Sequence, residues 1–533
     1  MNVAAEPVAD WNFGDLLDAT AANVPFDRPA LIQGARTVSW GDFDRRTNAL
    51  ARQMLARGLQ TGDRVAVLAR NIPEYIEIAA AVFKARLTYV NINFRYTTGE
   101  IKHVLSDSGA RALFCQAEFD SVAAPLFDSL ALVVRIGGGA AGQISYEAML
   151  VGDATPLGIP RSSHDGYMLY TGGTTGKPKG LIWRSGDVRA VQLESPLNKS
   201  PAKTMADHVH NVRTVSVPGR VIPACPLMHG AGLNSSMAEL VGGGAVILLP
   251  GDQFDAAELW DAAAQHAATR ILIVGDVFAR PMARALEANP GRWDLRALRA
   301  ISSAGLMWST EVKASLVASL PNVTLVDILG ASEASGLGYA FTTAATSTPT
   351  GYFDIPSTTV IIDVETGRLL APGKPGEGWV ARCPPFAHAY HGDADKTAAT
   401  FPVIDGVRYA IPGDLGERGA DGRLRLIGRG NMCINTGGEK VFPEEVEEAL
   451  KLLPGIDDAL VLGTPDPQWG RVVAALVHAD PGYDVAAARL ALRATLASYK
   501  VPKHLFVVPE VPRHASGKGD YRAAAVLLEA LLS

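Results

Sequence analysis

The sequence predicts an α/β fold with a large N-terminal domain and a small α+β C-terminal domain. At 533 residues the chain is too long for a single hydrophobic core, so at least two domains are expected. Near the N-terminus, predicted strands at residues 65–68 and 89–92 alternate with predicted helices, one running through Arg57 and one that starts with Asn71–Glu74 and runs to about Lys84. Such alternation is typical of a parallel sheet covered by helices.

Composition narrows the class of protein. Apolar residues make up 48% of the chain, charged residues 20%, and the net charge is −6 without a basic run, which argues against nucleic acid as a partner. The first residues lack a basic and apolar leader, and no apolar run is long enough to span a membrane, so we expect a cytoplasmic protein. Four widely spaced cysteines predict buried, reduced thiols: Cys115, Cys225, Cys383 and Cys433.

Residues 170–180 (YTGGTTGKPKG) follow an apolar run, residues 166–170, that predicts a buried strand. Glycines allow positive φ and close approach of a ligand to the backbone, threonines offer hydroxyls and lysines bring positive charge. Successive backbone N–H groups in such a loop form a concave site for an anion, most often a phosphate. The alternative is a glycine-rich surface turn, but such turns rarely need three threonines and two lysines.

The loop is not a Walker A motif, which requires G-x-x-x-x-G-K-[ST]. Thr171 stands where the first glycine is needed, and Pro178 follows Lys177. Proline has neither a hydroxyl for a metal nor an N–H for a phosphate, so a different phosphate-binding class is indicated.

The stretch resembles the phosphate loop of the adenylate-forming superfamily, which includes acyl-CoA synthetases, peptide-synthetase adenylation domains and luciferases. The resemblance implies that Thr175 takes part in catalysis. It also implies that the rest of the loop binds the phosphates of ATP, through Thr171, Gly172, Gly173, Thr174, Gly176 and Lys179.

A second motif is similar to the superfamily pattern aromatic-G-x-T-E. Here it appears as Leu329-Gly330-Ala331-Ser332-Glu333, with leucine in place of the aromatic residue. The resemblance implies that Gly330 and Ser332 contact the nucleotide and that Glu333 holds Mg²⁺.

Two further segments resemble the ribose site and the interdomain hinge. Residues 409–414 predict a strand that ends on Asp414, whose two carboxylate oxygens suit vicinal ribose hydroxyls. Residues 423–427 alternate in polarity like a hairpin strand and lead to Arg429, which the family places on the ribose. Asn431 occupies the hinge position, where Asp or Lys is usual.

The domain boundary is therefore predicted at Asn431, giving domains 1–430 and 431–533. The second domain is expected to be mobile and to contain a helix starting at Pro443 and strands at residues 459–463 and 472–479.

Two motifs of this second domain match the family. Gly437 and Gly438 match the small residues that border the passage for the pantetheine arm of coenzyme A. Lys518 matches the lysine whose ammonium enters the active site during adenylation.

The histidines receive separate interpretations. Residues 181–220 predict a surface excursion, with His208 and His210 on a solvated loop. His229 ends an apolar segment and would ordinarily be core packing, but the family places a gate for the acyl group there. His388 and His391 are interpreted as structural.

Together the motifs predict an ATP-dependent, AMP-forming acyl-CoA synthetase that uses ATP, Mg²⁺ and coenzyme A. Residues 170–176, 405–414 and 433–446 look closest to actinobacterial-type fatty-acyl and steroid side-chain CoA ligases, which favours a hydrophobic carboxylic acid as substrate. An aryl acid, or transfer of the acyl group to a carrier protein, stays open, and a luciferase-like activity is possible on the fold alone. A non-enzymatic nucleotide sensor would not need Lys518, Glu333 and a complete passage for the acceptor, all of which the sequence contains. A homodimer is compatible with the sequence.

Overall fold

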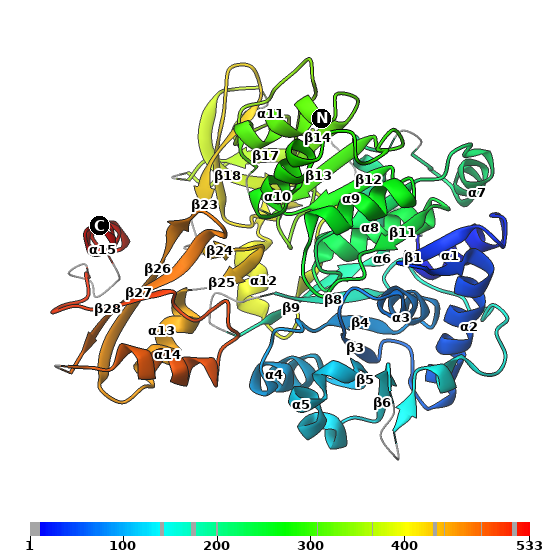
Figure 1. The fold of residues 1–533 in the computed structure, drawn as a ribbon, viewed down its shortest axis with the longest axis horizontal. Coiled ribbons are helices and arrows are strands. Elements are labelled where there is room, and N and C mark those ends of the chain that lie inside the picture. The colour runs from blue at the N-terminus through cyan, green and yellow to red at the C-terminus, as the bar shows by residue number, and fades with distance from the viewer. Residues whose placement is uncertain are drawn as a thin grey trace. The chain divides into compact units, whose positions relative to one another are not determined.

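The computed structural model describes residues 11–138, 143–171, 177–198, 201–305, 308–364, 366–371, 373–429, 434–441, 443–480, 482–513 and 520–533. The chain forms two compact units (Figure 1). The first contains most of the residues up to Gly428, and the second combines residues 95–106 and 170–179 with the chain from Arg429 onward. Both units mix helices and strands, which confirms the predicted α/β fold class.

Two eight-stranded sheets form the centre of the first unit. The first sheet is parallel except for its two edge strands. Its order is β15 (Gly338–Thr342), β14 (Thr324–Leu329), β13 (Ala300–Ala304), β12 (Arg270–Ile273), β10 (Arg220–Pro223), β11 (Ala245–Leu248), β1 (Pro29–Gln33) and β2 (Arg36–Ser39). The second sheet has the order β19 (Ala389–Tyr390), β9 (Lys179–Arg184), β8 (Gly166–Thr171), β4 (Thr88–Asn91), β3 (Arg64–Leu68), β5 (Ala110–Gln116), β6 (Leu132–Ile136) and β7 (Ile144–Ser145). The predicted strands at residues 65–68, 89–92 and 166–170 all belong to it.

Helices of the first unit connect and cover these sheets. They are α1 (Phe13–Ala21), α2 (Trp40–Ala56), α3 (Pro73–Lys84), α5 (Asp120–Ala123), α6 (Ser185–Glu194), α7 (Met205–Thr214), α8 (Gly230–Val241), α9 (Ala256–Gln265), α10 (Gly275–Ala288), α11 (Thr310–Ser319) and α12 (Ala394–Thr400), with 3₁₀ turns at Ala117–Phe119, Ala124–Ser129 and Glu147–Leu150. A five-stranded sheet follows in the order β16 (Tyr352–Phe353), β23 (Leu424–Arg429), β22 (Asp414–Arg418), β18 (Gly376–Arg382) and β17 (Thr359–Ile362), beside a small hairpin, β20 (Val403–Ile404) and β21 (Val407–Arg408). The hairpin predicted around residues 423–427 is β22 and β23.

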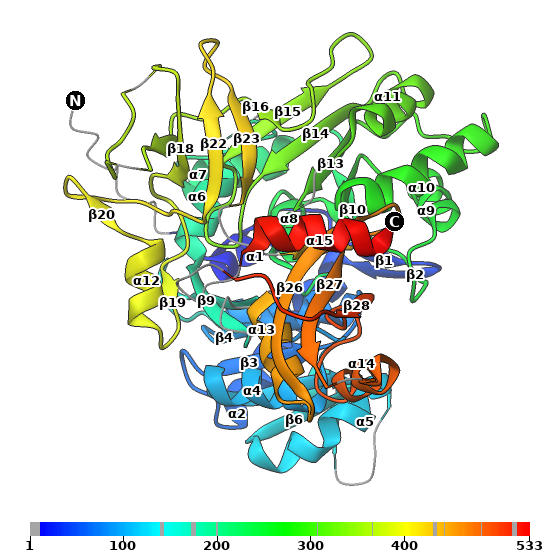
Figure 2. The same cartoon turned by 90° about the vertical axis from the view of Figure 1, so that its left-hand side faces the viewer.

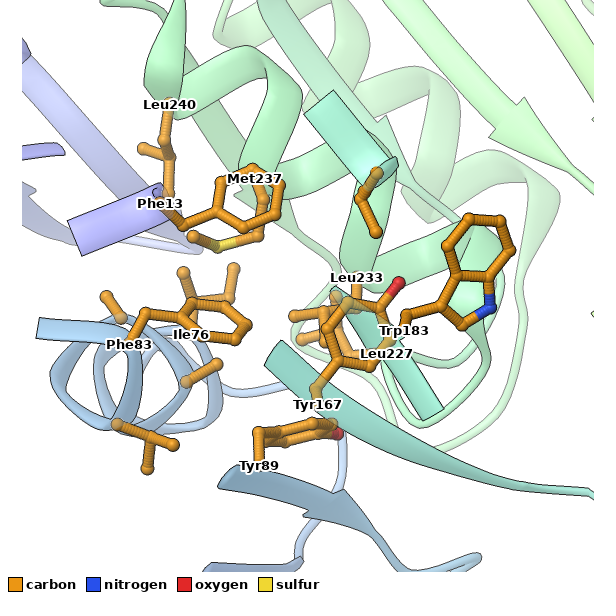
Figure 3. Close-up of a cluster of buried hydrophobic side chains, with 14 of the residues drawn as sticks. Phe13, Ile76, Phe83, Tyr89, Tyr167, Trp183, Leu227, Leu233, Met237 and Leu240 are labelled. Atoms are coloured by element: carbon orange, nitrogen blue, oxygen red, sulfur yellow. The ribbon is translucent and has the colours of Figure 1, made fainter. Parts of the chain in front are cut away.

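The main hydrophobic core joins side chains from both large sheets through α1, α3 and α8. All twelve residues of α3 are buried. Figure 3 shows Phe83 of α3 near Phe13 of α1 and Tyr167 of β8, with ring centroids 5.4 and 6.1 Å away. Met237 and Leu240 of α8 belong to the same cluster. An internal helix of this kind explains the nearly continuous apolar run Ile78–Phe83.

The charged residues of α3 are paired inside the fold, as burial requires. Glu77 accepts hydrogen bonds from Arg46 at 2.8 and 3.0 Å and from the Tyr146 hydroxyl at 2.6 Å. Lys84, at the other end of the helix, donates to Asp44 at 2.6 Å. These charges are therefore neutralised by neighbours.

One prediction about residues 181–220 is wrong. They contain α6 and α7 as well as the end of β9. A capping box at Thr204, with Asp207 three residues later, starts α7. His208 is 2% exposed, and its Nε2 lies 3.0 Å from the Thr20 hydroxyl. Burial, and then the charge of Arg189, lower the pKa of His208 to about 4, so it is a neutral core residue at pH 7.

The second unit contains a sheet with helices on both of its faces (Figure 2). The strands are β25 (Glu439–Val441), β24 (Ile434–Thr436), β27 (Gly470–Ala479), β26 (Ile456–Asp466) and β28 (His504–Val507), and the helices are α4 (Thr98–Ser108), α13 (Pro443–Lys451), α14 (Val485–Arg493) and α15 (Tyr521–Leu532). Successive residues of β26 face opposite sides: Val461 packs with α13 and α14, whereas Leu462 packs with α15. The helix predicted at Pro443 and both predicted strands are confirmed.

A buried lysine fastens α4 to the rest of this unit. Lys500 donates to Glu100 at 2.8 Å and to Glu445 at 2.7 Å, and its ammonium lies 5.1 Å from the centre of the Tyr96 ring. The side chain of Lys500 is 1% exposed. These contacts explain why residues 95–106 belong to the second unit.

Among the described helices, none combines the length and the apolar character needed to cross a membrane.

Candidate functional site

The predicted phosphate loop connects β8 to β9. Thr171 is the last residue of β8 and Lys179 the first of β9. Gly172, Gly173, Thr174, Thr175 and Gly176 lie outside the described residues, so their predicted contacts stay predictions. At the end of the loop, the carbonyl oxygen of Pro178 lies 2.9 Å from Nε2 of His103.

The turn that carries Ser332 and Glu333 follows β14. The Ala331 N–H donates to the Ala334 carbonyl at 2.8 Å, and the Leu337 N–H donates to the Leu329 carbonyl at 2.9 Å. Trp183, on the strand that leaves the predicted phosphate loop, donates its indole N–H to the Ser332 carbonyl at 2.9 Å. This bond ties the motif after β14 to β9, two segments about 150 residues apart in the sequence.

Residues 387–390 hold Glu333 at two points. The Ala387 N–H donates to the Glu333 carbonyl at 3.0 Å, and the Tyr390 hydroxyl donates to the Glu333 carboxylate. Burial, and then the charge of Glu333, raise the pKa of Tyr390 well above its ordinary value, so the phenol keeps the proton that it donates. Tyr390 also pairs with Leu181 of β9.

Glu333 differs from Glu77 in the charge that surrounds it. The Glu77 carboxylate is paired with the Arg46 guanidinium. Among the described residues, no lysine, arginine or histidine forms an ion pair with Glu333. Its side chain is half-buried. A single carboxylate of this kind suits Mg²⁺, which proteins usually bind through one or two carboxylates together with substrate phosphates. The described residues contain no cluster of three or more potential metal ligands.

His229 is the N-cap of α8, and two asparagines fix the segment before it. Asn71 donates to the Cys225 carbonyl at 3.0 Å and accepts from the Leu227 N–H at 2.8 Å. Asn91 donates to the Met228 carbonyl at 2.8 Å. The segment before His229 follows β10 of the first large sheet. Asn71, which follows β3, and Asn91, at the end of β4, hold it to the second large sheet. Both large sheets therefore fix the backbone that leads to His229.

Asp414 lies on the five-stranded sheet and is 2% exposed. The prediction that it ends a strand is wrong, because it is the first residue of β22. β21 stops at Arg408, and the chain then passes through Pro412, which lacks an N–H, and Gly413, whose φ is +94°. Arg429, the residue that the family resemblance assigns to the ribose, is the last residue of β23.

Gly437 and Gly438 form the turn between β24 and β25, with φ values of +55° and +88°. The Gly437 N–H donates to the Trp469 carbonyl at 3.1 Å, and a Cβ at this position would lie 2.6 Å from Cε3 of the Trp469 ring. Glycine is therefore required here by the turn and by the close tryptophan, whatever passes beside it.

Lys518, Asn431 and Cys433 lie outside the described residues. Cys115 and Cys225 are buried, as predicted, and burial raises the pKa of each thiol to about 12. Cys383, also predicted to be buried, is half-buried. His388 is half-buried, and its Nε2 lies 3.0 Å from Nη2 of Arg184, in agreement with a structural role.

Tyr390 was not among the predicted site residues. Nothing in the string Ala387-His388-Ala389-Tyr390 indicates a partner 57 positions earlier. The available signal was its proximity to Phe386 and Phe401, which predicts a local aromatic cluster but not a hydroxyl contact with an acid.

Comparison with known protein families gives the class of this protein. The AMP-binding enzyme family matches residues 17–388, and the C-terminal domain of AMP-binding enzymes matches residues 445–518. The chain therefore belongs to the AMP-binding enzyme family, as the resemblance implied.

Relatives with named activities match nearly the whole chain. One is a medium/long-chain-fatty-acid–CoA/3-oxocholest-4-en-26-oate–CoA ligase of Mycolicibacterium smegmatis, 36% identical over 97% of this chain and 96% of that protein. Another is a 3-oxocholest-4-en-26-oate–CoA ligase of Rhodococcus rhodochrous, 37% identical over 96% and 95%. An amide bond synthetase from Marinactinospora thermotolerans shares the fold, with a TM-score of 0.79 at 23% identity over 97% of this chain and 99% of that one.

Proposed function

We propose that this enzyme is an ATP-dependent, AMP-forming acyl-CoA synthetase that activates a hydrophobic carboxylic acid. The observation that carries the proposal is the Glu333 turn. The Glu333 carboxylate forms no ion pair with a described residue and accepts a hydrogen bond from Tyr390. The Ser332 carbonyl of the same turn accepts from Trp183, on the strand that leaves a loop rich in Gly, Thr and Lys. This arrangement suits a nucleotide bound with a divalent cation.

The chemistry follows from the properties of a carboxylate. Its carbon is a poor electrophile, and oxide is not a usable leaving group. Attack of a carboxylate oxygen on the α-phosphorus of ATP forms the acyl–AMP bond and releases pyrophosphate. The thiol of coenzyme A then attacks the acyl carbon, the thioester forms and AMP leaves.

The first step joins two anions, so positive charge must be placed where negative charge develops. We assign this role to the ammonium of Lys518 and place the loop 171–180 on the β- and γ-phosphates. Glu333 would hold Mg²⁺, which when bound offsets the charge of the phosphates.

The other assignments follow the family motifs. Gly330 and Ser332 contact the nucleotide, Asp414 and Arg429 the ribose, and Gly437 and Gly438 the pantetheine arm. His229, at the N-terminus of α8, faces the acyl group. We divide the chain into domains 1–430 and 431–533, and a swivel at Asn431 would exchange Lys518 for the Gly437-Gly438 turn between the two steps.

For the acid, we propose a medium or long fatty acid or a steroid or terpenoid side chain. Support comes from the two CoA ligases named above, which match the chain almost end to end. An aryl acid is the second candidate, favoured by a feruloyl-CoA synthase of Amycolatopsis that is 30% identical over 92% of this chain. The cytoplasmic location and the homodimer stay predictions from the sequence.

The test is release of AMP and pyrophosphate from ATP, with coenzyme A present, across a panel of fatty, steroid and aryl acids. We expect AMP release to match thioester formation and to be fastest for one fatty or steroid acid. Release of ADP would exclude adenylation. AMP release without thioester would instead indicate transfer to another acceptor, such as a carrier protein or an amine.

Lys518→Ala separates the two steps. Formation of acyl-AMP should fall at least about 100-fold, because a fixed charge at the reacting phosphate is lost. Conversion of supplied acyl-AMP to thioester should remain within a few-fold of the original rate. Equal survival of both steps would show that Lys518 does not act in adenylation.

A further inference from the structure

The Glu333 carboxylate is held by a segment that is itself firmly fixed. Tyr390 is 5% exposed, and its ring centroid lies 6.2 Å from that of Phe401 and 4.8 Å from the ammonium of Lys396. Its N–H donates to the Thr397 hydroxyl at 3.0 Å. The ring and backbone are thus restrained on several sides, so the hydroxyl has little freedom to leave the carboxylate.

The same segment is bonded to the strand that follows the predicted phosphate loop. Ala389 and Tyr390 pair with Ile182 and Leu181 of β9, and the His391 N–H donates to the Gly180 carbonyl at 2.7 Å. The residues that fix Glu333 are therefore attached to the strand that the phosphate loop enters.

We propose that Tyr390 is a positioning residue that orients the Glu333 carboxylate toward the divalent cation bound with ATP. The inference rests on the proposed function, because it assumes that Glu333 meets that cation. The phenol occupies one carboxylate oxygen, Oε1, and so fixes the rotation of the carboxylate and the direction of the second oxygen. Outer partners of this type commonly change metal affinity 10- to 100-fold when they are removed.

Tyr390→Phe removes only the hydroxyl and keeps the ring that packs on Phe401. Tyr146→Phe is the matched control, since it also removes a buried tyrosine hydroxyl from a glutamate, Glu77, outside the proposed site. Unfolding midpoints in urea establish that both variants fold.

The first readout is binding rather than turnover. Electron paramagnetic resonance measures Mn²⁺ binding in the presence of α,β-methylene-ATP. We expect the Kd for Mn²⁺ to rise about 10-fold or more in Tyr390→Phe and to stay unchanged in Tyr146→Phe. In a Glu333→Gln background, which should itself weaken binding, the Tyr390 substitution should add little, because the two residues act together.

The second readout is AMP formation at increasing Mg²⁺. In Tyr390→Phe the half-saturating Mg²⁺ concentration should rise by a similar factor, while kcat at saturating Mg²⁺ stays within about two-fold. A loss of kcat that excess Mg²⁺ does not restore would overturn the inference, as would unchanged Mn²⁺ affinity in Tyr390→Phe when Glu333→Gln has lost it. If Glu333→Gln also binds Mn²⁺ normally, both the metal role of Glu333 and the role of Tyr390 are wrong. Failure of the proposed function is distinct: the unsubstituted enzyme would then release no AMP with any acid.

Discussion

Glu77 and Glu333 each accept a hydrogen bond from a tyrosine hydroxyl, yet their surroundings differ in charge. Glu77 is fully buried and also accepts two hydrogen bonds from Arg46. Glu333 is half-buried and forms no ion pair with any residue that the structure describes. Where the fold supplies its own cation, the carboxylate stabilises the protein. Where it supplies only a hydroxyl, as at Glu333, we propose that the charge serves a cation that arrives with a ligand.

The largest effect on stability is expected from Glu77→Ala. This change leaves the Arg46 guanidinium and the Tyr146 hydroxyl without their acceptor in a largely buried place. Removing one partner of a buried pair costs about 3–5 kcal/mol, and the 24% exposure of Arg46 points to the lower end. Urea unfolding measures the loss. A loss below about 1 kcal/mol would remove the distinction between the two glutamates.

Glu333→Gln should show the reverse behaviour. The amide still accepts from Tyr390, so the free energy of unfolding should change by less than about 1 kcal/mol. Acyl-AMP formation should fall about 100-fold at limiting Mg²⁺, because a charge near the phosphates is lost. The rate of acyl-AMP formation is measured as pyrophosphate released in samples quenched at successive times. Strong destabilisation with normal turnover would make Glu333 a structural residue like Glu77.

His208 sharpens the comparison, because it is buried beside a neutral hydroxyl and its pKa is lowered to about 4. Between that value and the ordinary pKa near 6.5, the unfolded chain binds more protons at His208 than the folded chain does. The free energy of unfolding therefore decreases as the pH falls through this range. We expect a loss of about 1–2 kcal/mol between pH 7 and pH 5. Unfolding of His208→Gln at both pH values should show a smaller difference, and an equal difference would contradict the assignment.

Tyr146→Phe should give the smallest effect. Glu77 keeps both bonds to Arg46, so the loss in stability should be about 1 kcal/mol. The Mg²⁺ dependence of AMP formation should not change. A shifted Mg²⁺ dependence would mean that buried tyrosine–glutamate bonds act on the metal through general stability rather than through position.

Local patterns were enough to predict many elements of the fold. Helix α3, the strands predicted at residues 459–463 and 472–479 and the helix start at Pro443 follow from spacing and composition, and the structure confirms them. The prediction that Asp414 ends a strand fails because Pro412 and Gly413 interrupt the extended chain, so that β22 begins at Asp414. The reason is local, since proline lacks an N–H for strand pairing and Gly413 has a positive φ.

Contacts between distant segments could not be predicted from the sequence alone. The burial of His208 depends on Thr20, 188 residues earlier, and the orientation of Glu333 depends on Tyr390, 57 residues later. Neither contact leaves a periodic or motif signal, because each involves one side chain brought near by the order of strands in a sheet. Glu333 itself was found through its motif, whereas the residue that orients it was not.

The contacts of Ala387 and Tyr390 with Glu333 also restrict where insertions can be tolerated. The Ala387 N–H and the Tyr390 hydroxyl, three residues apart, both bond to Glu333, so a residue inserted between them would break one of the two hydrogen bonds. The hairpin of β20 and β21, which begins 13 residues after Tyr390, is under no such requirement from Glu333, and its turn could lengthen. Among related enzymes, gaps in an alignment should therefore collect in the hairpin and avoid residues 387–390.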